Sequence, residues 1–424
     1  MPCRHALGPS FRAKLRLKRG AMALALVMGG MQPTIAATPA AATLLQTPAP
    51  PPPPETALWW HSAGDAVLDQ LIERGLATDK PLACEAQALH RDGGKARTRD
   101  KRLDRRIARL FGAAGAEADS ADLQARAYDY ADHRARLAAR IAATYLDVRR
   151  LQEIATLRRK MQAQFKDNAE IARFRREAGL VDGLDVGLAG SLVAINGSSL
   201  DADRQTFEDK ARELADLTGM DETTLLASLG EEGKVPDLTI AAAAMPADKA
   251  TPPTGIALYR ADLAALERRL TAGLLRDGVG AQDIASALSV SGGDAGADEK
   301  AALAARSLGR LRAAENDARA QIARERDAMT ATAARLATLD RKARDSRATA
   351  ASARVAYRNG MVPFSALYAA EAAGSGLSEA GIGARATLAG SAVRLARALG
   401  LGWVTGDLQP GPVGISSTEV LVCE

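Results

Sequence analysis

The chain has 424 residues, of which 47% are hydrophobic, 25% charged and only 4% aromatic. These fractions are those of a folded protein, and the scarcity of aromatic residues favours long helices over a β-sandwich or an aromatic-lined enzyme core. The formal net charge is +5, but the first 20 residues hold six cations and no acidic residue, so the remainder carries 5 − 6 = −1. No nucleic-acid partner is therefore expected.

The N-terminal segment has the pattern of an export signal. Cations end at Arg19, an apolar run covers residues 21–28, and small residues follow around Ala36 and Ala37. This pattern predicts a signal peptide over residues 1–37, cleaved after Ala36 or Ala37. Residues 38–56, with five prolines at 50–54, are expected to form a disordered tether. No later apolar run reaches the roughly 18 residues of a membrane helix.

Two parts of the chain match at an offset of 181 residues. Residues 172–181 align with residues 353–362, and the spacing between two glycines is 40 residues in both halves, from Gly179 to Gly219 and from Gly360 to Gly400. A spacing preserved together with flanking matches indicates a duplicated structural unit.

The repeated unit is predicted to be a long helical hairpin. Residues 121–178 contain neither Pro nor Gly, and apolar residues from Leu137 to Phe165 recur every 3.5 residues on average, which is the heptad period of coiled coils. A glycine then permits the chain to reverse, and return helices are expected over residues 184–218 and 364–399. A filament-like coiled coil would fit the same pattern.

We therefore expect a mainly α fold with little β-structure, built of long antiparallel coiled-coil hairpins in two internal repeats. The first repeat is assigned to residues 57–250, with its tip near 179–185. The second is assigned to residues 251–403, with its tip near 360–364, and a tail covers residues 404–424.

Several short motifs, in a fixed order, resemble the outer-membrane factor (TolC-like) family over residues 57–403. The motifs are Trp59-Trp60, the Asp-x-x-Leu-x-x-Leu-Ile pattern at 65–72, Leu110-Phe111-Gly112, and the stretches 142–149, 260–268 and 398–403. The two predicted tips, residues 179–186 and 357–364, also resemble those of the family. No single motif is decisive, but their order along the chain is specific.

The resemblance implies a homotrimeric outer-membrane channel of an efflux or secretion system, a passive duct for small molecules. Each protomer would give helical hairpins to a periplasmic tunnel and four β-strands to a shared outer-membrane barrel. An inner-membrane pump would supply the energy. A periplasmic adaptor would dock, or a gate would close, at tip residues Gly179, Leu180, Val181, Asp182, Asp185, Tyr357, Gly360, Met361, Val362, Pro363 and Phe364. Asp182 and Asp185 either narrow a pore electrostatically or are ordinary turn and helix N-cap residues.

The expected membrane strands are the point at which the sequence departs from the family. Residues 91–109 hold nine cations and three aspartates, and a net charge of +6 over this stretch cannot face lipid. Only residues 286–291 alternate weakly in the second half. We favour a truncated barrel, and the basic stretch would also suit anionic lipid headgroups. A non-conducting periplasmic scaffold made of the same helices is the alternative function.

No pattern in the sequence predicts an enzyme, a cofactor site or a metal site. His61, His90 and His133 lie far apart, and an Asp129–His133 pair on a polar helix is more often solvated than catalytic. The glycines at 278 and 280 do not belong to a phosphate loop or dinucleotide fingerprint. The sequon at Asn196 falls in a return helix and is interpreted as incidental. Whether Cys84 and Cys423 pair is left open.

Overall fold

The computed structural model describes residues 52, 54–102, 113–238, 240, 259–280, 283–284, 299–411 and 423, and every regular element among them is a helix. The mainly α fold expected from the sequence is confirmed. The predicted signal peptide, most of the Pro-rich segment, Leu110-Phe111-Gly112 and the alternating residues 286–291 lie outside the described residues.

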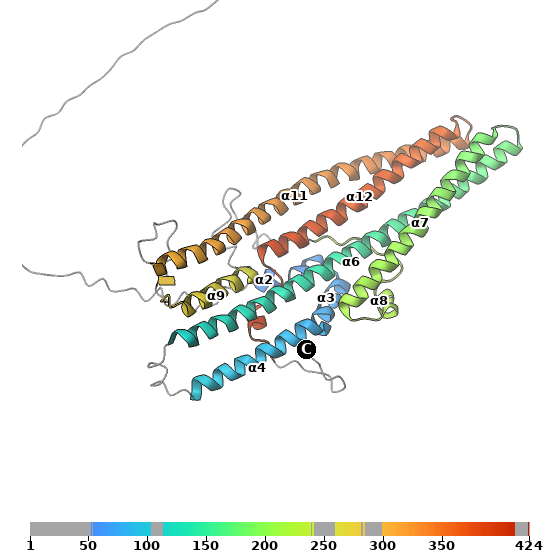
Figure 1. Ribbon diagram of the computed structural model, residues 1–424. Coiled ribbons are helices and arrows are strands. Elements are labelled where there is room, and N and C mark those ends of the chain that lie inside the picture. The colour runs from blue at the N-terminus through green and yellow to red at the C-terminus, as the bar shows by residue number, and fades with distance from the viewer. Residues whose placement is uncertain are drawn as a thin grey trace, which may run out of the picture. The chain divides into compact units, whose positions relative to one another are not determined.

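Four long helices form two antiparallel hairpins (Figure 1). They are α6 (Ala113–Glu177) with α7 (Gly183–Thr218), and α11 (Glu299–Arg358) with α12 (Phe364–Leu399). The end of α6, the start of α7 and the end of α7 each lie 181 residues before the corresponding points of α11 and α12. The offset seen in the sequence is therefore the offset between two copies of one hairpin.

Shorter helices pack around the end of the hairpins away from the turns (Figure 1). In chain order they are α2 (Pro54–Ala57), η1 (Trp59–Ala63), α3 (Ala66–Thr78), α4 (Lys80–Arg102), α8 (Glu222–Leu229), α9 (Ala261–Arg276) and η4 (Thr405–Leu408). Helix α4 includes residues 91–102, so this part of the basic stretch is helical. No helix among the described residues is both long and apolar enough to cross a membrane.

The heptad stripe of α6 faces the protein interior. Leu137, Ile141, Tyr145, Val148, Leu151, Ile154 and Phe165 are buried, and Leu157 and Met161 are half-buried. On the Ala-rich helix α11, Ile322 is buried while Met329 and Leu336 are half-buried. The second hairpin has fewer large apolar side chains, so small residues form much of the contact between its two helices.

The main core lies where the shorter helices meet the hairpins. Trp59, Trp60 and Ile72 pack there with Ile141 and Leu395. The Trp-rich motif therefore contributes to the core, and the Asp-x-x-Leu motif begins a helix and contributes to the same core.

The same region contains a buried polar chain. Asp65 caps α3 by accepting hydrogen bonds from the backbone N–H groups of Val67 and Leu68. The Tyr145 hydroxyl donates to Asp65 Oδ2 at 2.5 Å, and Arg149 Nε donates to the Tyr145 hydroxyl at 2.7 Å. Burial and the Asp65 contact raise the pKa of Tyr145 above its ordinary value.

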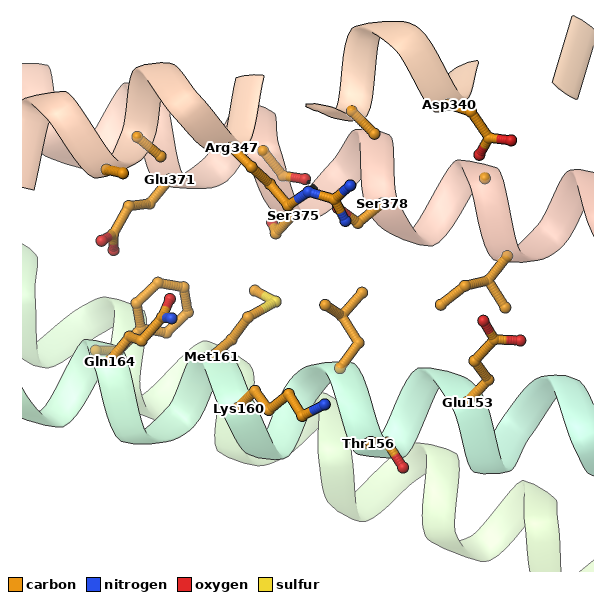
Figure 2. Close-up of a pocket in the computed structure, with 18 of the residues that line it drawn as sticks. Glu153, Thr156, Lys160, Met161, Gln164, Asp340, Arg347, Glu371, Ser375 and Ser378 are labelled. Atoms are coloured by element: carbon orange, nitrogen blue, oxygen red, sulfur yellow. Dashed lines mark hydrogen bonds between the residues drawn. The ribbon is translucent and has the colours of Figure 1, made fainter. Parts of the chain in front are cut away.

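An extended segment after α8 lies tightly against α6. Arg149 Nη1 donates to the Leu229 carbonyl and Gln152 Nε2 to the Gly230 carbonyl, both at 2.8 Å. A Cβ atom on Gly233 would stand 2.3 Å from the side-chain oxygen of Gln152, so a larger residue would displace the Gln152 and Arg149 side chains that hold this segment. This segment, with α6, α11 and α12, lines a groove that is shown in close-up in Figure 2.

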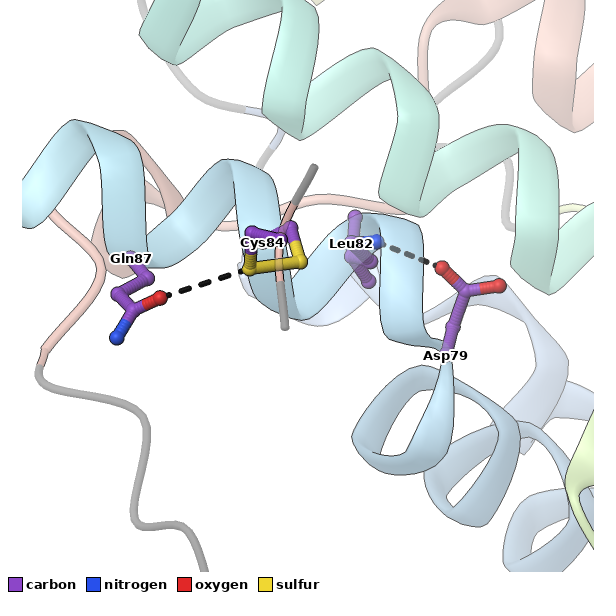
Figure 3. Close-up of a disulfide and its surroundings, with 5 residues drawn as sticks. Asp79, Leu82, Cys84 and Gln87 are labelled. Carbon is purple, nitrogen blue, oxygen red and sulfur yellow. Dashed lines mark hydrogen bonds between the residues drawn. A yellow bond between two sulfur atoms is a disulfide. The ribbon is translucent and has the colours of Figure 1, made fainter. Parts of the chain in front are cut away.

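Cys84 and Cys423 form a disulfide (Figure 3). Their Cα atoms are 5.7 Å apart, although 339 residues separate them in the sequence. The bond ties Cys423, near the end of the chain, to helix α4. The pairing that the sequence left open is thus present in the structure.

Candidate functional site: the hairpin tips

The two hairpins turn in the same way. At the first tip, Gly179 has φ +73°, and the N–H groups of Gly179 and Leu180 donate to the carbonyls of Arg176 and Arg175 at 2.9 and 2.8 Å. At the second, Gly360 has φ +74°, and the corresponding hydrogen bonds measure 3.0 and 2.9 Å. Both are Schellman motifs, which close a helix with a left-handed residue, and this is why glycine stands at the same place in both repeats.

Different residues start the return helices. Asp182 is the N-cap of α7, where its carboxylate accepts hydrogen bonds from the N–H groups of Leu184 and Asp185 at 2.9 and 3.4 Å. The N-cap of α12 is Pro363, which offers no side-chain acceptor. Asp182 therefore has the helix-capping role that the sequence left open, while Asp185 lies half-buried in the first turn of α7.

The structure brings the two tips together at one end (Figure 1). Arg175 of α6 donates from Nη1 to the Tyr357 carbonyl at 2.6 Å, and its guanidinium carbon lies 4.7 Å from the centre of the Tyr357 ring. The Tyr357 and Phe364 rings meet edge to face, 5.3 Å apart, in a cluster that also contains Ala172 of α6 and Leu192 of α7.

The predicted tip residues divide into an exposed and a buried group. Gly179, Leu180, Asp182, Gly360, Met361 and Pro363 are exposed, and Val181, Asp185 and Val362 are half-buried. Tyr357 and Phe364 are fully buried, so they support the tips from inside. Burial, followed by the nearby charge of Asp185, raises the pKa of Tyr357.

Large apolar side chains are exposed at this end, beside exposed charged residues such as Arg176 and Arg358. Leu180, Leu184 and Met361 are 68%, 65% and 66% exposed, and Phe174 and Val355 are each 57% exposed. Seven large apolar side chains are exposed in the described residues, and these five lie at the tips. They come from the ends of α6 and α11, from the two hairpin turns and from the start of α7. A concentration of exposed large apolar side chains at one end of a protein favours an interaction surface there.

Below the tips, polar contacts join the first hairpin to the second. Glu371 of α12, buried to 3% side-chain exposure, accepts from Asn168 Nδ2 of α6 at 3.0 Å and from Arg354 Nη2 of α11 at 2.7 Å. Farther down, Arg158 of α6 contacts Glu379 of α12 at 3.2 Å.

Sequence reasoning missed these joining residues, although a signal was present. Asn168 follows Phe165 by three positions and Glu371 follows Leu367 by four, so both continue an apolar stripe with a polar side chain. A polar residue at a core position of a coiled coil commonly fixes which helices pair.

The histidines form separate surface contacts. His133 Nδ1 lies 3.1 Å from Glu85, His61 Nδ1 lies 3.0 Å from Asp69, and Asp129 pairs with Arg269. Within the part of the chain that the structure describes, no three His, Cys, Asp or Glu side chains are grouped as a metal site. Asn196 of the sequon is buried, and its amide donates to Gln162 Oε1 at 2.7 Å.

Comparison with known proteins gives matches in structure. No model of a known protein family matches the sequence, and no curated protein gives a significant match. The outer-membrane channel OprN is similar with 20% identity and a TM-score of 0.66, over 82% of this chain and 93% of that chain. A membrane protein from Pseudomonas aeruginosa is 16% identical with a TM-score of 0.64, over 85% and 96%.

The outer membrane protein VceC from Vibrio cholerae is 18% identical with a TM-score of 0.62, over 81% of this chain and 98% of that chain. The chain thus has the fold of outer-membrane channels of the TolC-like type. The resemblance found in the sequence motifs is confirmed at the level of fold.

Proposed function

We propose that this chain is the outer-membrane subunit of a tripartite efflux or secretion system and acts as a passive export duct for small molecules. The observation that carries the proposal is the pair of matched hairpins whose tips meet at one end, in a fold shared with outer-membrane channels. The sequence holds no nucleotide-binding pattern, so an inner-membrane pump would supply the energy.

The duct would be a homotrimer, located in the outer membrane and periplasm after export. One chain contributes two hairpins side by side, and a closed tube needs further copies of this unit. The hairpins leave many side chains of α11 exposed, which neighbouring protomers would cover.

A periplasmic adaptor would dock at the tips. The exposed residues Leu180, Leu184 and Met361 supply apolar contact area, while the buried Tyr357 and Phe364 hold the two turns in fixed positions. A rigid apolar patch suits docking because little conformational freedom is lost on binding. Asp185, beside Tyr357 and half-exposed, is the tip carboxylate left for a gating role, since Asp182 caps α7.

Conductance in a planar lipid bilayer tests the duct directly. Purified, crosslinked trimer should give discrete single-channel steps, and membrane fractionation should place the same trimer with the outer membrane. Absence of steps from a protein that crosslinks as a trimer would refute conduction and favour the periplasmic scaffold.

One observation supports that scaffold as the second candidate. Residues 91–102, within the stretch where the resemblance implies membrane strands, lie in helix α4 and hold six cations and two aspartates. A helical stretch with this charge does not fit a lipid-facing strand. A trimer bound to anionic liposomes through residues 91–109, without conductance, is the result the scaffold predicts; charge-reversal variants of this stretch should then lose liposome binding.

A further inference from the structure

The groove between the two hairpins has the dimensions of a ligand site. Its volume is about 800 Å³, and its walls come from α6 on one side and from α11 and α12 on the other. The segment around Gly233 also lines it, near Glu153 of α6. Cavities of roughly 300–1,000 Å³ are typical of small-molecule sites.

The interior of the groove is apolar. Leu157, Met161 and Phe165 line it from α6, and Ala350 and Ile382 line it from α11 and α12. Phe165 and Ile382 are 4% and 5% exposed, whereas Leu157 and Met161 remain half-buried. Apolar area is therefore left for a guest to cover.

Three acidic side chains that line the groove are already paired. Arg354 binds Glu371, with Nη2 and Oε1 2.7 Å apart. Arg385 contacts both Glu153 and Asp340, the latter at 3.7 Å. Two arginines therefore balance two of the three negative charges and leave a net charge of 2 − 3 = −1 on this group.

Five lysine or arginine and four aspartate or glutamate side chains line the groove, so its net charge is 5 − 4 = +1. Lys160 of α6 and Arg347 of α11 stand on opposite walls (Figure 2), and Lys234 lies in the segment that borders the groove. None of the three forms an ion pair in the part of the chain that the structure describes, and Glu232 is the lining carboxylate without such a pair there. Three cations over an apolar interior complement an anion that carries an apolar body.

We propose that this groove binds a small anionic amphiphile, with its carboxylate, sulfate or phosphate head between Lys160 and Arg347 and its apolar body against Leu157, Met161 and Ile382. Lysine and arginine on two walls favour an anionic head over a neutral or cationic one through charge-assisted hydrogen bonds. Because the groove lies within one chain, binding to it can be measured whether or not the protein conducts.

Decanoate is the probe for the test. Isothermal titration of the full-length chain, with decanoate below its micelle concentration, should show saturable binding with one site per chain. The variant with both Lys160→Glu and Arg347→Glu should bind at least about tenfold more weakly, because two charge-assisted contacts become repulsive.

The matched control carries Lys166→Glu and Arg344→Glu. Both residues are exposed, lie on the same two helices and do not line the groove, so the net charge changes equally. The control should bind decanoate like the wild type. Equal weakening in both double variants would show a general charge effect and overturn the site.

Two further measurements separate the other occupants. Decanol and decyltrimethylammonium should bind at least about tenfold more weakly than decanoate, and equal binding would mean an apolar docking face without anion selectivity. A photoreactive decanoate should crosslink within residues 157–165, 340–354 or 374–385, the parts of α6, α11 and α12 that contain the groove-lining residues. Crosslinks confined to other helices would refute the assignment.

Discussion

Glu371 gives the sharpest stability prediction, because three helices meet at its carboxylate. Arg354 donates to Oε1 from Nε and Nη2 at 3.0 and 2.7 Å, and Asn168 Nδ2 lies 3.0 Å from both carboxylate oxygens. Asn168 is 1% exposed and the side chain of Arg354 is 22% exposed. Removing the carboxylate therefore leaves the buried Asn168 amide without its acceptor, while Arg354 keeps only its contact with Gln164 Oε1 at 3.1 Å.

Two substitutions separate the charge of Glu371 from its hydrogen bonds. Glu371→Ala removes both and should lower the free energy of unfolding by about 2–4 kcal/mol. Glu371→Gln should cost only about 1 kcal/mol. The amide oxygen still accepts from Arg354, and Oδ1 of Asn168, which accepts no hydrogen bond from the described residues, can turn to accept from the new amide.

Urea unfolding followed by circular dichroism measures these differences. Glu208→Gln is the matched control, because Glu208 pairs with Arg204 on the surface of α7 and is 42% exposed, so its loss should cost at most about 0.5 kcal/mol. The reasoning fails if Glu371→Ala stays within that range of the wild type. It also fails if Glu371→Ala and Glu371→Gln cost the same.

Three further outcomes follow from the structure. Cys84→Ser should lower the free energy of unfolding by about 2–5 kcal/mol and abolish the effect of a reductant on urea unfolding. In the wild type, the raised pKa keeps the Tyr145 hydroxyl protonated in the folded state while it ionises in the unfolded state, so the free energy of unfolding falls as the pH rises above about 10. Tyr145→Phe should make this fall smaller. A double variant with Leu180→Asp and Met361→Asp should weaken adaptor capture at least about tenfold without changing the melting temperature. The control Leu226→Asp, on α8, should leave adaptor capture unchanged. Unchanged capture by the double variant would remove the tips as the docking surface.

The helical framework could be predicted from the sequence because its determinants are local and repeated. The heptad stripe from Leu137 to Phe165 and the glycines at 179 and 360 fix where helices run and end. The first long helix begins at Ala113, before the expected start at 121, because Gly115 is accommodated inside it. A single glycine in a long packed helix costs only about 1 kcal/mol.

The contacts that join the halves could not be predicted in the same way. Arg175 meets Tyr357 across 182 residues, and Cys84 meets Cys423 across 339. Local spacing can mark Asn168 and Glu371 as polar residues on an apolar stripe, but it does not name the helix that each of them meets. Tyr357, one of the tip residues that the resemblance implies, is buried against Phe364 in a cluster that also contains Ala172 and Leu192 of the first hairpin.

Arg175 shows how one of these contacts acts. Its guanidinium donates to the Tyr357 carbonyl in the last turn of α11, which also accepts from the Gly360 N–H at 3.0 Å, and the helix dipole favours a cation at this end. Arg175→Met keeps an apolar stem but removes that donor, which should lower the local stability of the tip by about 1–2 kcal/mol. The tip cluster is separate from the main core. The loss should therefore appear as local opening, with amides of residues 353–364 exchanging hydrogen roughly 5–30 times faster and global stability little changed.

Arg176→Met, on an exposed neighbour, is the control and should leave exchange unaltered. Faster exchange spread evenly along α11, or none at the tip, would contradict a local bridge between the two hairpins.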